Sequence, residues 1–235
     1  GFDGTIAVQA REMPKETGYL LALAAVHPEI MGVVGWLDLC ATGIEQELEQ
    51  FADAAKLKGL RMLIHDRPDA EFAISDAHVN GVSKLAQFGL TYDLLLKPPH
   101  LPAAIELVDR LPNQMFVVDH IAKPDIRNQV MEPWHGLMAE LARRSNVYCK
   151  LSSVITQADW QAWTDADVLP FLDAACEAFG PDRIMVGSDW PVSTCAAGYV
   201  ETMGLFERWS KKLSTSEQDA FMGGNCARFY GVKEL

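Results

Sequence analysis

The hydrophobic positions of the chain fall into two alternating patterns. Short apolar runs rich in Val, Ile and Leu are typical of buried strands, whereas longer segments repeat their apolar residues at helical spacing. The pattern predicts strands over 5–10, 30–39, 60–64, 90–96, 115–118, 147–151 and 184–187. It predicts helices over 15–26, 43–58, 75–88, 101–111, 132–145, 199–212 and 216–230, and a partly helical stretch over 158–179 that breaks at Pro170.

Strands and helices alternate strictly, with no linker, repeat or low-complexity stretch between them. Such alternation of apolar strands with helices indicates a parallel sheet covered by helices. Seven strand–helix units in 235 residues favour an α/β fold, a (β/α)8 TIM barrel lacking its first strand, in a single domain over 1–235. A doubly wound sheet is the alternative, but no G-x-G-x-x-G or G-K-[ST] follows any predicted strand.

Composition and charge limit the classes of partner that the protein is expected to bind. The formal net charge of −12 disfavours nucleic acid and anionic membrane surfaces, although an anionic small substrate needs only local Lys or Arg. No apolar run approaches the ~20 residues of a membrane span, and no signal peptide is evident. The five cysteines have no C-x-x-C or zinc-type spacing. Reduced thiols in a cytoplasmic protein are therefore expected.

Ionisable residues follow several of the predicted strands. Asp189 comes directly after the strand 184–187, and His65, His120 and Lys150 lie at the ends of three others. Side chains two residues apart share a face of a strand, so the last polar member of each row can point to the carboxyl edge of the sheet. If they do, one base, two imidazoles and one cation converge in a single concave site, a constellation suited to hydrolysis.

Each candidate also has a structural interpretation. A Ser-Asp pair after a strand often only caps the next helix, and His65 could be a loop residue that forms hydrogen bonds. Asp119 precedes His120 and should face the opposite side, which favours a structural role. Lys123 can reach the same opening or lie on the surface. Trp190 is the tryptophan best placed to line a pocket.

Six strings of the sequence carry a family resemblance. They are VVGWLDL (33–39), GLRMLIHDRPD (59–69), GLTYDLLLKPPHLPAAIELVDRLP (89–112), VVDHIAKPDI (117–126), RIMVGSDWPV (183–192) and GNCARFYGV (224–232). In this order they resemble the amidohydrolase-related family of the amidohydrolase superfamily. The resemblance is greatest to its branch of sugar-acid and dicarboxylate lactonases, which includes L-fucono-, L-rhamnono- and 2-pyrone-4,6-dicarboxylate lactonases. It covers nearly the whole chain and implies a (β/α)8 barrel.

The resemblance also implies residue roles. Asp189 matches the last-strand aspartate that activates water, and His120 matches the histidine that polarises the lactone carbonyl or, in metal-dependent relatives, binds the metal. Five residues lie where members of this branch hold substrate: Arg61, His65, Tyr92, Lys123 and Lys150. We expect no required metal. A single divalent ion such as Zn²⁺, held by His120 and Asp189, is the alternative.

One feature departs from the family. Its members carry a His-x-His pair on the first barrel strand, and no H-x-H occurs in this sequence. Because Gly1 falls just before the second family strand, we expect that the first strand is absent from this chain. Its barrel would then be open at the strands 5–10 and 183–188, which could pair with another chain, so a homo-oligomer is considered.

The sequence therefore predicts a hydrolase that opens a lactone of a sugar acid or a related carboxylated lactone. Asp189 would activate the attacking water, and His120 would stabilise the oxyanion. One alternative is a metal-dependent decarboxylase or C–C hydrolase of the same superfamily that acts on aromatic carboxylates. Another is an inactive barrel that serves only for binding.

Overall fold

The computed structural model describes residues 2–232, which form two compact units. Unit 1 contains residues 2–95, 102–117 and 227–232, and unit 2 contains residues 96–101 and 118–226. Seven strands of the described residues form one sheet with the order β1-β2-β3-β4-β5-β6-β7, the order of the chain. The predicted α/β fold with seven strands is confirmed, whereas the single domain and the missing first strand stay predictions.

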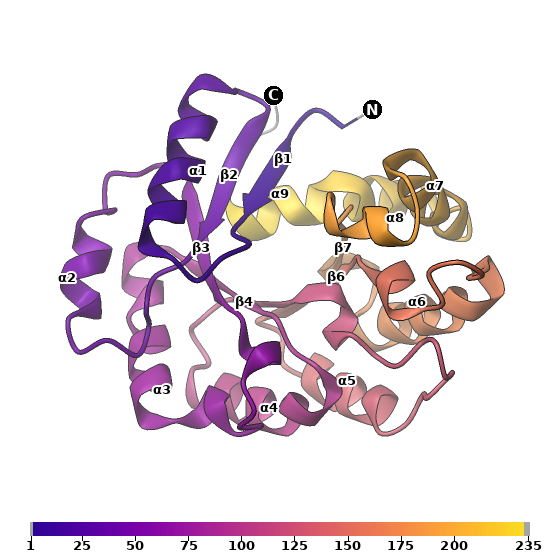
Figure 1. The fold of residues 1–235 in the computed structure, drawn as a ribbon, viewed down its shortest axis with the longest axis horizontal. Helices are drawn as coiled ribbons and strands as arrows, with labels where there is room; N and C mark the ends of the chain where they lie inside the picture. Colours follow the sequence, from indigo (N-terminus) through magenta and orange to yellow (C-terminus); the bar gives the residue numbers. More distant parts are fainter. Residues whose placement is uncertain (1, 233–235) are drawn as a thin grey trace. The chain divides into compact units, whose positions relative to one another are not determined.

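Unit 1 is built on parallel strands covered by helices. Its strands are β1 Thr5–Val8, β2 Ile30–Gly35, β3 Leu57–Met62, β4 Thr91–Leu94 and the start of β5 Phe116–Val118. Its helices are α1 Pro14–Val26, α2 Ile44–Glu49, α3 Asp76–Ser83, most of α4 Leu101–Arg110 and the end of α9 Asn225–Tyr230. The pairs β1–β2, β2–β3 and β3–β4 are parallel, and α1 lies against β2 (Figure 1).

Unit 2 contains β6 Val147–Leu151 and β7 Ile184–Val186, which are parallel neighbours. Its helices are α5 Trp134–Ala142, α6 Asp165–Phe179, α7 Tyr199–Ser210 and α8 Thr215–Asp219, the last continuing into one π-helical turn, Ala220–Gly224. Aromatic pairs pack its core: Trp134 lies 5.4 Å from Phe171 and Trp209 lies 5.1 Å from Phe221, measured between ring centroids. Within residues 2–232, every helix is too short or too polar to cross a bilayer.

The predicted helix over 43–58 is wrong in its second half. Helix α2 ends at Glu49, and β3 begins at Leu57, three residues earlier than predicted. The reason is pairing with β2, because Leu57 lies opposite Val33 and the Val33 N–H donates to the Lys56 carbonyl at 2.7 Å. Ladder hydrogen bonds here outweigh the helical spacing of the apolar residues.

The predicted break at Pro170 is also wrong, since α6 runs through Pro170 from Asp165 to Phe179. Proline at this position removes one backbone donor. The helix starts with a capping box between Thr164 and Asp167, whose side chains and backbone N–H groups bond reciprocally. Its buried face, which includes Phe171 and Leu172, packs in the core of unit 2. Capping and burial together offset the lost hydrogen bond.

The predicted strand 30–39 ends at Gly35 because helix α1 supplies the next hydrogen bonds. Thr17 Oγ1 accepts from the Trp36 N–H at 2.8 Å and donates to the Trp36 carbonyl at 2.7 Å. A side chain therefore replaces the neighbouring strand, and the chain leaves the sheet at this residue.

A buried His–Tyr pair in unit 1 gives a prediction for stability against pH. His78 Nδ1 donates to the Ala73 carbonyl at 2.8 Å, and Tyr92 donates its hydroxyl to His78 Nε2 at 2.7 Å. Burial lowers the pKa of His78 to about 4. Between about pH 6.5 and pH 4, His78 is therefore protonated in the unfolded chain but neutral in the folded chain. The free energy of unfolding falls as the pH drops through this range.

We expect protonation of His78 in the unfolded chain to lower the free energy of unfolding by about 2 kcal/mol between pH 7 and pH 5. In His78→Gln the amide can keep both hydrogen bonds but does not titrate, so the pH dependence should shrink by that amount. Urea unfolding at the two pH values measures it, with the exposed His27→Gln as control. Equal pH slopes in wild type and His78→Gln would contradict the assignment.

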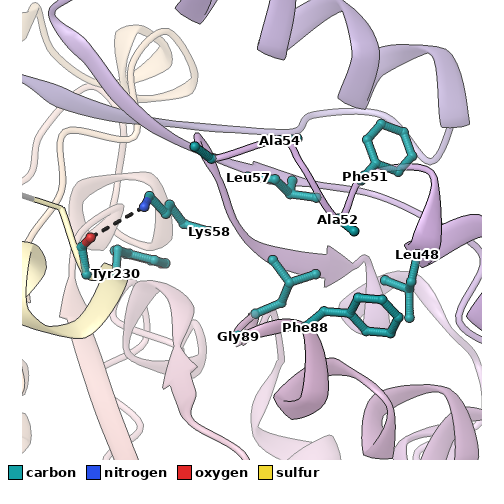
Figure 2. A pocket seen from close by; sticks show the side chains of 12 residues that line it. Leu48, Phe51, Ala52, Ala54, Leu57, Lys58, Phe88, Gly89 and Tyr230 are labelled. Carbon is teal, nitrogen blue, oxygen red and sulfur yellow. Dashed lines mark hydrogen bonds between the residues drawn. The ribbon is translucent and has the colours of Figure 1, made fainter.

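Unit 1 also contains a cavity of about 280 Å³ near the start of β3 and β4. Figure 2 shows it between the side chains of Leu48, Phe51, Leu57 and Phe88, with Lys58 Nζ donating to the Gly231 carbonyl at 3.4 Å. Carboxylate and imidazole groups are absent from its lining in the described chain. Since catalytic groups of parallel α/β sheets gather at the other ends of the strands, the cavity is no candidate for the chemistry.

Candidate active site

The first half of the site is a turn directly after β5. Residues 120–123 all have φ between 47° and 57°, which places four consecutive non-glycine residues in the left-handed region. Single residues rarely adopt this conformation, and it persists where the surroundings fix it. Here Trp134 Nε1 donates to the Ile121 carbonyl at 2.6 Å, and Ile121 and Ala122 are fully buried. The turn, rather than the alternation of the strand, sets the direction of His120.

The turn begins with a buried ion pair. Lys150 Nζ on β6 lies 2.7 Å from Asp119 Oδ1, and the Asp119 side chain has no exposed surface. A charge without solvent needs a partner, which each of these groups supplies to the other. The Asp119 carboxylate is thus held by Lys150, and the structural role expected for it stays a prediction. The proposed contact of Lys150 with substrate stays a prediction, and its ammonium is engaged by Asp119.

The second half of the site follows β7. Asp189 lies three residues beyond the strand, in the left-handed conformation with φ 50°, and its carbonyl accepts from the Ser193 N–H at 2.9 Å. Its Oδ1 lies 3.6 Å from His120 Nε2. The His120 and Asp189 side chains are 10% and 15% exposed, so the pair is shielded yet still reaches solvent. The structure thus brings together the two residues to which the sequence assigned the chemistry.

Two serines after β6 contact this pair. Ser152 Oγ lies 2.8 Å from His120 Nδ1, and Ser153 Oγ donates to Asp189 Oδ2 at 2.5 Å. Gly187 leaves room for Ser152, because a Cβ at position 187 would lie 3.1 Å from Ser152 Cβ. The sequence analysis did not assign a role to either serine. The signal that could have found them is a pair of hydroxyls directly after a strand, at the edge where the other candidates lie.

Three predicted substrate-binding residues belong to unit 1. Arg61 is buried and donates to the Gln9 carbonyl, while Gln9 Nε2 donates to the Arg61 carbonyl at 3.0 Å. His65 Nε2 lies 3.2 Å from Asp66 Oδ2 in a short turn after β3. Tyr92 is fully buried on β4 beside His78. Their substrate-binding roles stay predictions.

The other two candidates, both in unit 2, follow His120 and Asp189 in the sequence. Lys123 ends the left-handed turn, and its N–H donates to the His120 carbonyl at 2.8 Å. Trp190 comes directly after Asp189 and is 63% exposed, so its ring is accessible to a ligand. These positions are compatible with substrate contact, which also stays a prediction.

The residues that could hold a metal are fewer than a catalytic zinc site uses. His120 and Asp189 supply one nitrogen and one carboxylate, whereas such a site takes three protein ligands and an open position. Within residues 2–232, no group of three His, Cys, Asp or Glu side chains is arranged to hold an ion. The described chain therefore does not fit a complete zinc site, and we derive no reaction step through one.

Comparisons with known proteins give the family context. The family model described as "Amidohydrolase" matches residues 6–232. The L-fucono-1,5-lactonase of Burkholderia multivorans is 38% identical over 98% of this chain and 81% of its own length. The L-fucono-1,5-lactonase of Burkholderia ambifaria is 33% identical over 99% of this chain and 81% of its own length.

A solved structure gives the same picture. The crystal structure of an amidohydrolase from Burkholderia multivorans with bound zinc superposes with a TM-score of 0.94 at 36% identity. The match covers 98% of this chain and 84% of that one. Fold and family thus agree, and the pair at the ends of β5 and β7 can be considered in this context.

Proposed function

Because the chain belongs to the amidohydrolase family, we propose that it is a hydrolase that opens the ring of a sugar-acid lactone. Two curated relatives at 33% and 38% identity are L-fucono-1,5-lactonases, so L-fucono-1,5-lactone is the first substrate to test. The single observation that carries the chemistry is the shielded pair formed by His120 Nε2 and Asp189 Oδ1 at 3.6 Å.

Lactone opening needs a base and an oxyanion stabiliser on the two sides of one carbonyl carbon. In the proposed reaction Asp189 removes a proton from water, and the resulting hydroxide forms the new C–O bond. His120 Nε2–H donates to the carbonyl oxygen while negative charge develops there. The tetrahedral intermediate then expels the ring oxygen, and Asp189 returns the proton to it. One water molecule is added to one lactone in total, and the open-chain acid is formed.

The environment of each group supports its role. Asp189 is held by the Ser153 hydroxyl on Oδ2, which leaves Oδ1 for water. Partial burial of the pair strengthens the field of both groups at the carbonyl. For the substrate, we propose that Lys123 contacts an oxygen-rich part of the sugar acid and that Trp190 covers one face of the ring. Lys123 is the last residue of the turn that begins with His120, and Trp190 directly follows Asp189.

The assigned steps use side chains alone, so we expect lactone opening to continue after treatment with EDTA. A similar amidohydrolase from Burkholderia multivorans was crystallised with zinc, so a loss of activity on chelation is also an outcome that the experiment must be able to detect. Loss of activity on chelation and recovery with Zn²⁺ would overturn the metal-independent mechanism while leaving the lactonase proposal in place. Measured zinc content before and after chelation serves as the control.

The substrate class is tested with a panel. The purified protein is offered L-fucono-1,5-lactone, other sugar-acid 1,4- and 1,5-lactones, and hydroxylated aromatic carboxylates. Proton release follows lactone opening, and released CO2 follows decarboxylation. We expect saturable proton release with at least one sugar-acid lactone and no CO2. CO2 release from an aromatic carboxylate without lactone opening would replace the proposed function by that of a decarboxylase.

A further inference from the structure

Two consecutive serines follow β6, and each contacts one of the two proposed reacting groups. Ser152 contacts the imidazole of His120, and Ser153 contacts the carboxylate of Asp189. Side chains of adjacent residues in a strand point to opposite faces. Here the chain has left β6, and Ser153 adopts the left-handed conformation with φ 59°. Both serines are almost fully buried, so neither hydroxyl has bulk water as an alternative partner.

The contact of His120 Nε2 with Asp189 determines which of Ser152 and His120 Nδ1 donates the hydrogen bond between them. Neutral histidine carries one proton, on Nδ1 or on Nε2. If the proton were on Nδ1, the lone pair of Nε2 would face the carboxylate of Asp189 at 3.6 Å. The arrangement with a proton on Nε2 avoids this repulsion and leaves Nδ1 as an acceptor. The Ser152 hydroxyl at 2.8 Å then donates to Nδ1.

The direction at Ser153 follows from its partners as well. A carboxylate only accepts, so the Ser153 proton points to Asp189 Oδ2. Thr156 Oγ1 lies 2.7 Å from Ser153 Oγ and 2.7 Å from the Ser153 carbonyl. Because Ser153 gives its own proton to Asp189, the single Thr156 proton is shared between these two acceptors. Gln157 Nε2 in turn donates to Thr156 Oγ1 at 2.9 Å. This series of donors orients the Ser153 hydroxyl towards the carboxylate.

We propose that Ser152 and Ser153 are positioning residues that give opposite hydrogen-bond roles to His120 and Asp189. Ser152 holds His120 as the tautomer with its proton on Nε2, the atom that faces Asp189 and, on the proposed function, the lactone carbonyl. Ser153 holds Asp189 by one oxygen so that the other stays available as a base. The inference rests on the proposed function for its catalytic meaning, but its hydrogen-bond assignment does not depend on any substrate.

Nuclear magnetic resonance of protein with ¹⁵N-labelled histidine tests the assignment directly. The signals of His120 are identified by their loss in His120→Gln. At a pH where this imidazole is neutral, we expect the wild type to show a protonated Nε2 and an acceptor Nδ1. In Ser152→Ala the Nδ1 signal should move towards that of an acceptor without a donor. A protonated Nδ1 in the wild type would overturn the inference.

Kinetics with the best lactone of the panel provides the second measurement. We expect Ser152→Ala and Ser153→Ala each to lower kcat about 10- to 100-fold while KM changes less than about threefold, because misplaced groups act mainly on the chemical step. The matched control is Ser210→Ala, a buried serine whose hydroxyl donates to the Glu207 carbonyl in α7. It should leave kcat within twofold of the wild type.

The outcomes separate the two levels of the proposal. Unchanged kcat in both serine variants, or equal losses in Ser210→Ala, would overturn the positioning role. Thermal unfolding of every variant shows whether a loss of kcat reflects unfolded protein. A wild type without lactone activity would overturn the proposed function alone, because the tautomer measurement needs no turnover.

Discussion

We expect Asp189→Asn to lower kcat/KM for a sugar-acid lactone about a thousandfold, within the range that general bases contribute. Asparagine has nearly the shape of aspartate and can still accept from Ser153 through its amide oxygen. It cannot take a proton from water, so the attacking nucleophile is neutral water instead of nascent hydroxide. The loss should appear in kcat, since the base acts in the transition state and not in substrate binding.

A carboxylate at the opposite end of the same strand provides the control. Asp182 lies in the turn that precedes β7 and is exposed. Asp182→Asn changes the net charge by the same amount, and its kcat/KM should stay within twofold of the wild type. Initial rates of proton release measure both variants. If Asp189→Asn retains more than a tenth of the wild-type kcat/KM, Asp189 is not the base.

The second large effect concerns stability. We expect Lys150→Met to lower the free energy of unfolding by about 3–5 kcal/mol. The Asp119 carboxylate, whose side chain has no exposed surface, loses the ammonium 2.7 Å away that compensates its charge. Methionine fills a similar volume, so the loss comes from the uncompensated charge rather than from a cavity. Urea unfolding at pH 7 measures it.

Two further variants separate the ion pair from other effects of the lysine. The double variant Asp119→Asn with Lys150→Met removes both charges of this pair, and about half or more of the lost stability should return. Lys84→Met removes a lysine that pairs with Glu45 at 3.4 Å near the surface, and it should cost less than about 1 kcal/mol. A loss in Lys150→Met as small as in Lys84→Met would show that the ion pair does not stabilise the fold.

Much of the fold could be predicted because buried parallel strands are nearly continuous apolar runs. The strand predicted over 147–151 coincides with β6, and the helix predicted over 101–111 differs from α4 by one residue. The family resemblance is confirmed by the family model that matches residues 6–232. The ends of elements were less predictable, since backbone groups there find partners elsewhere, as Trp36 does on Thr17.

The local geometry of the site could not be predicted in the same way. No glycine marks the left-handed turn 120–123, which depends instead on the buried contacts of Ile121 and on the indole of Trp134. The pairing of Lys150 with Asp119 and the contacts of Ser152 and Ser153 join residues about 30 to 40 positions apart. Sequence spacing identifies which residues follow strands, but only packing determines which atoms they meet.

The most direct test of the central claim is the fate of oxygen in a single turnover in H₂¹⁸O, with protein in excess over L-fucono-1,5-lactone. If Asp189 activates water, the ring-opened acid gains one ¹⁸O in its carboxylate, and the peptide that contains Asp189 gains none. A protein-dependent opening that leaves the acid unlabelled and puts ¹⁸O into Asp189 would mean that this carboxylate attacks the lactone itself. That result would contradict the account.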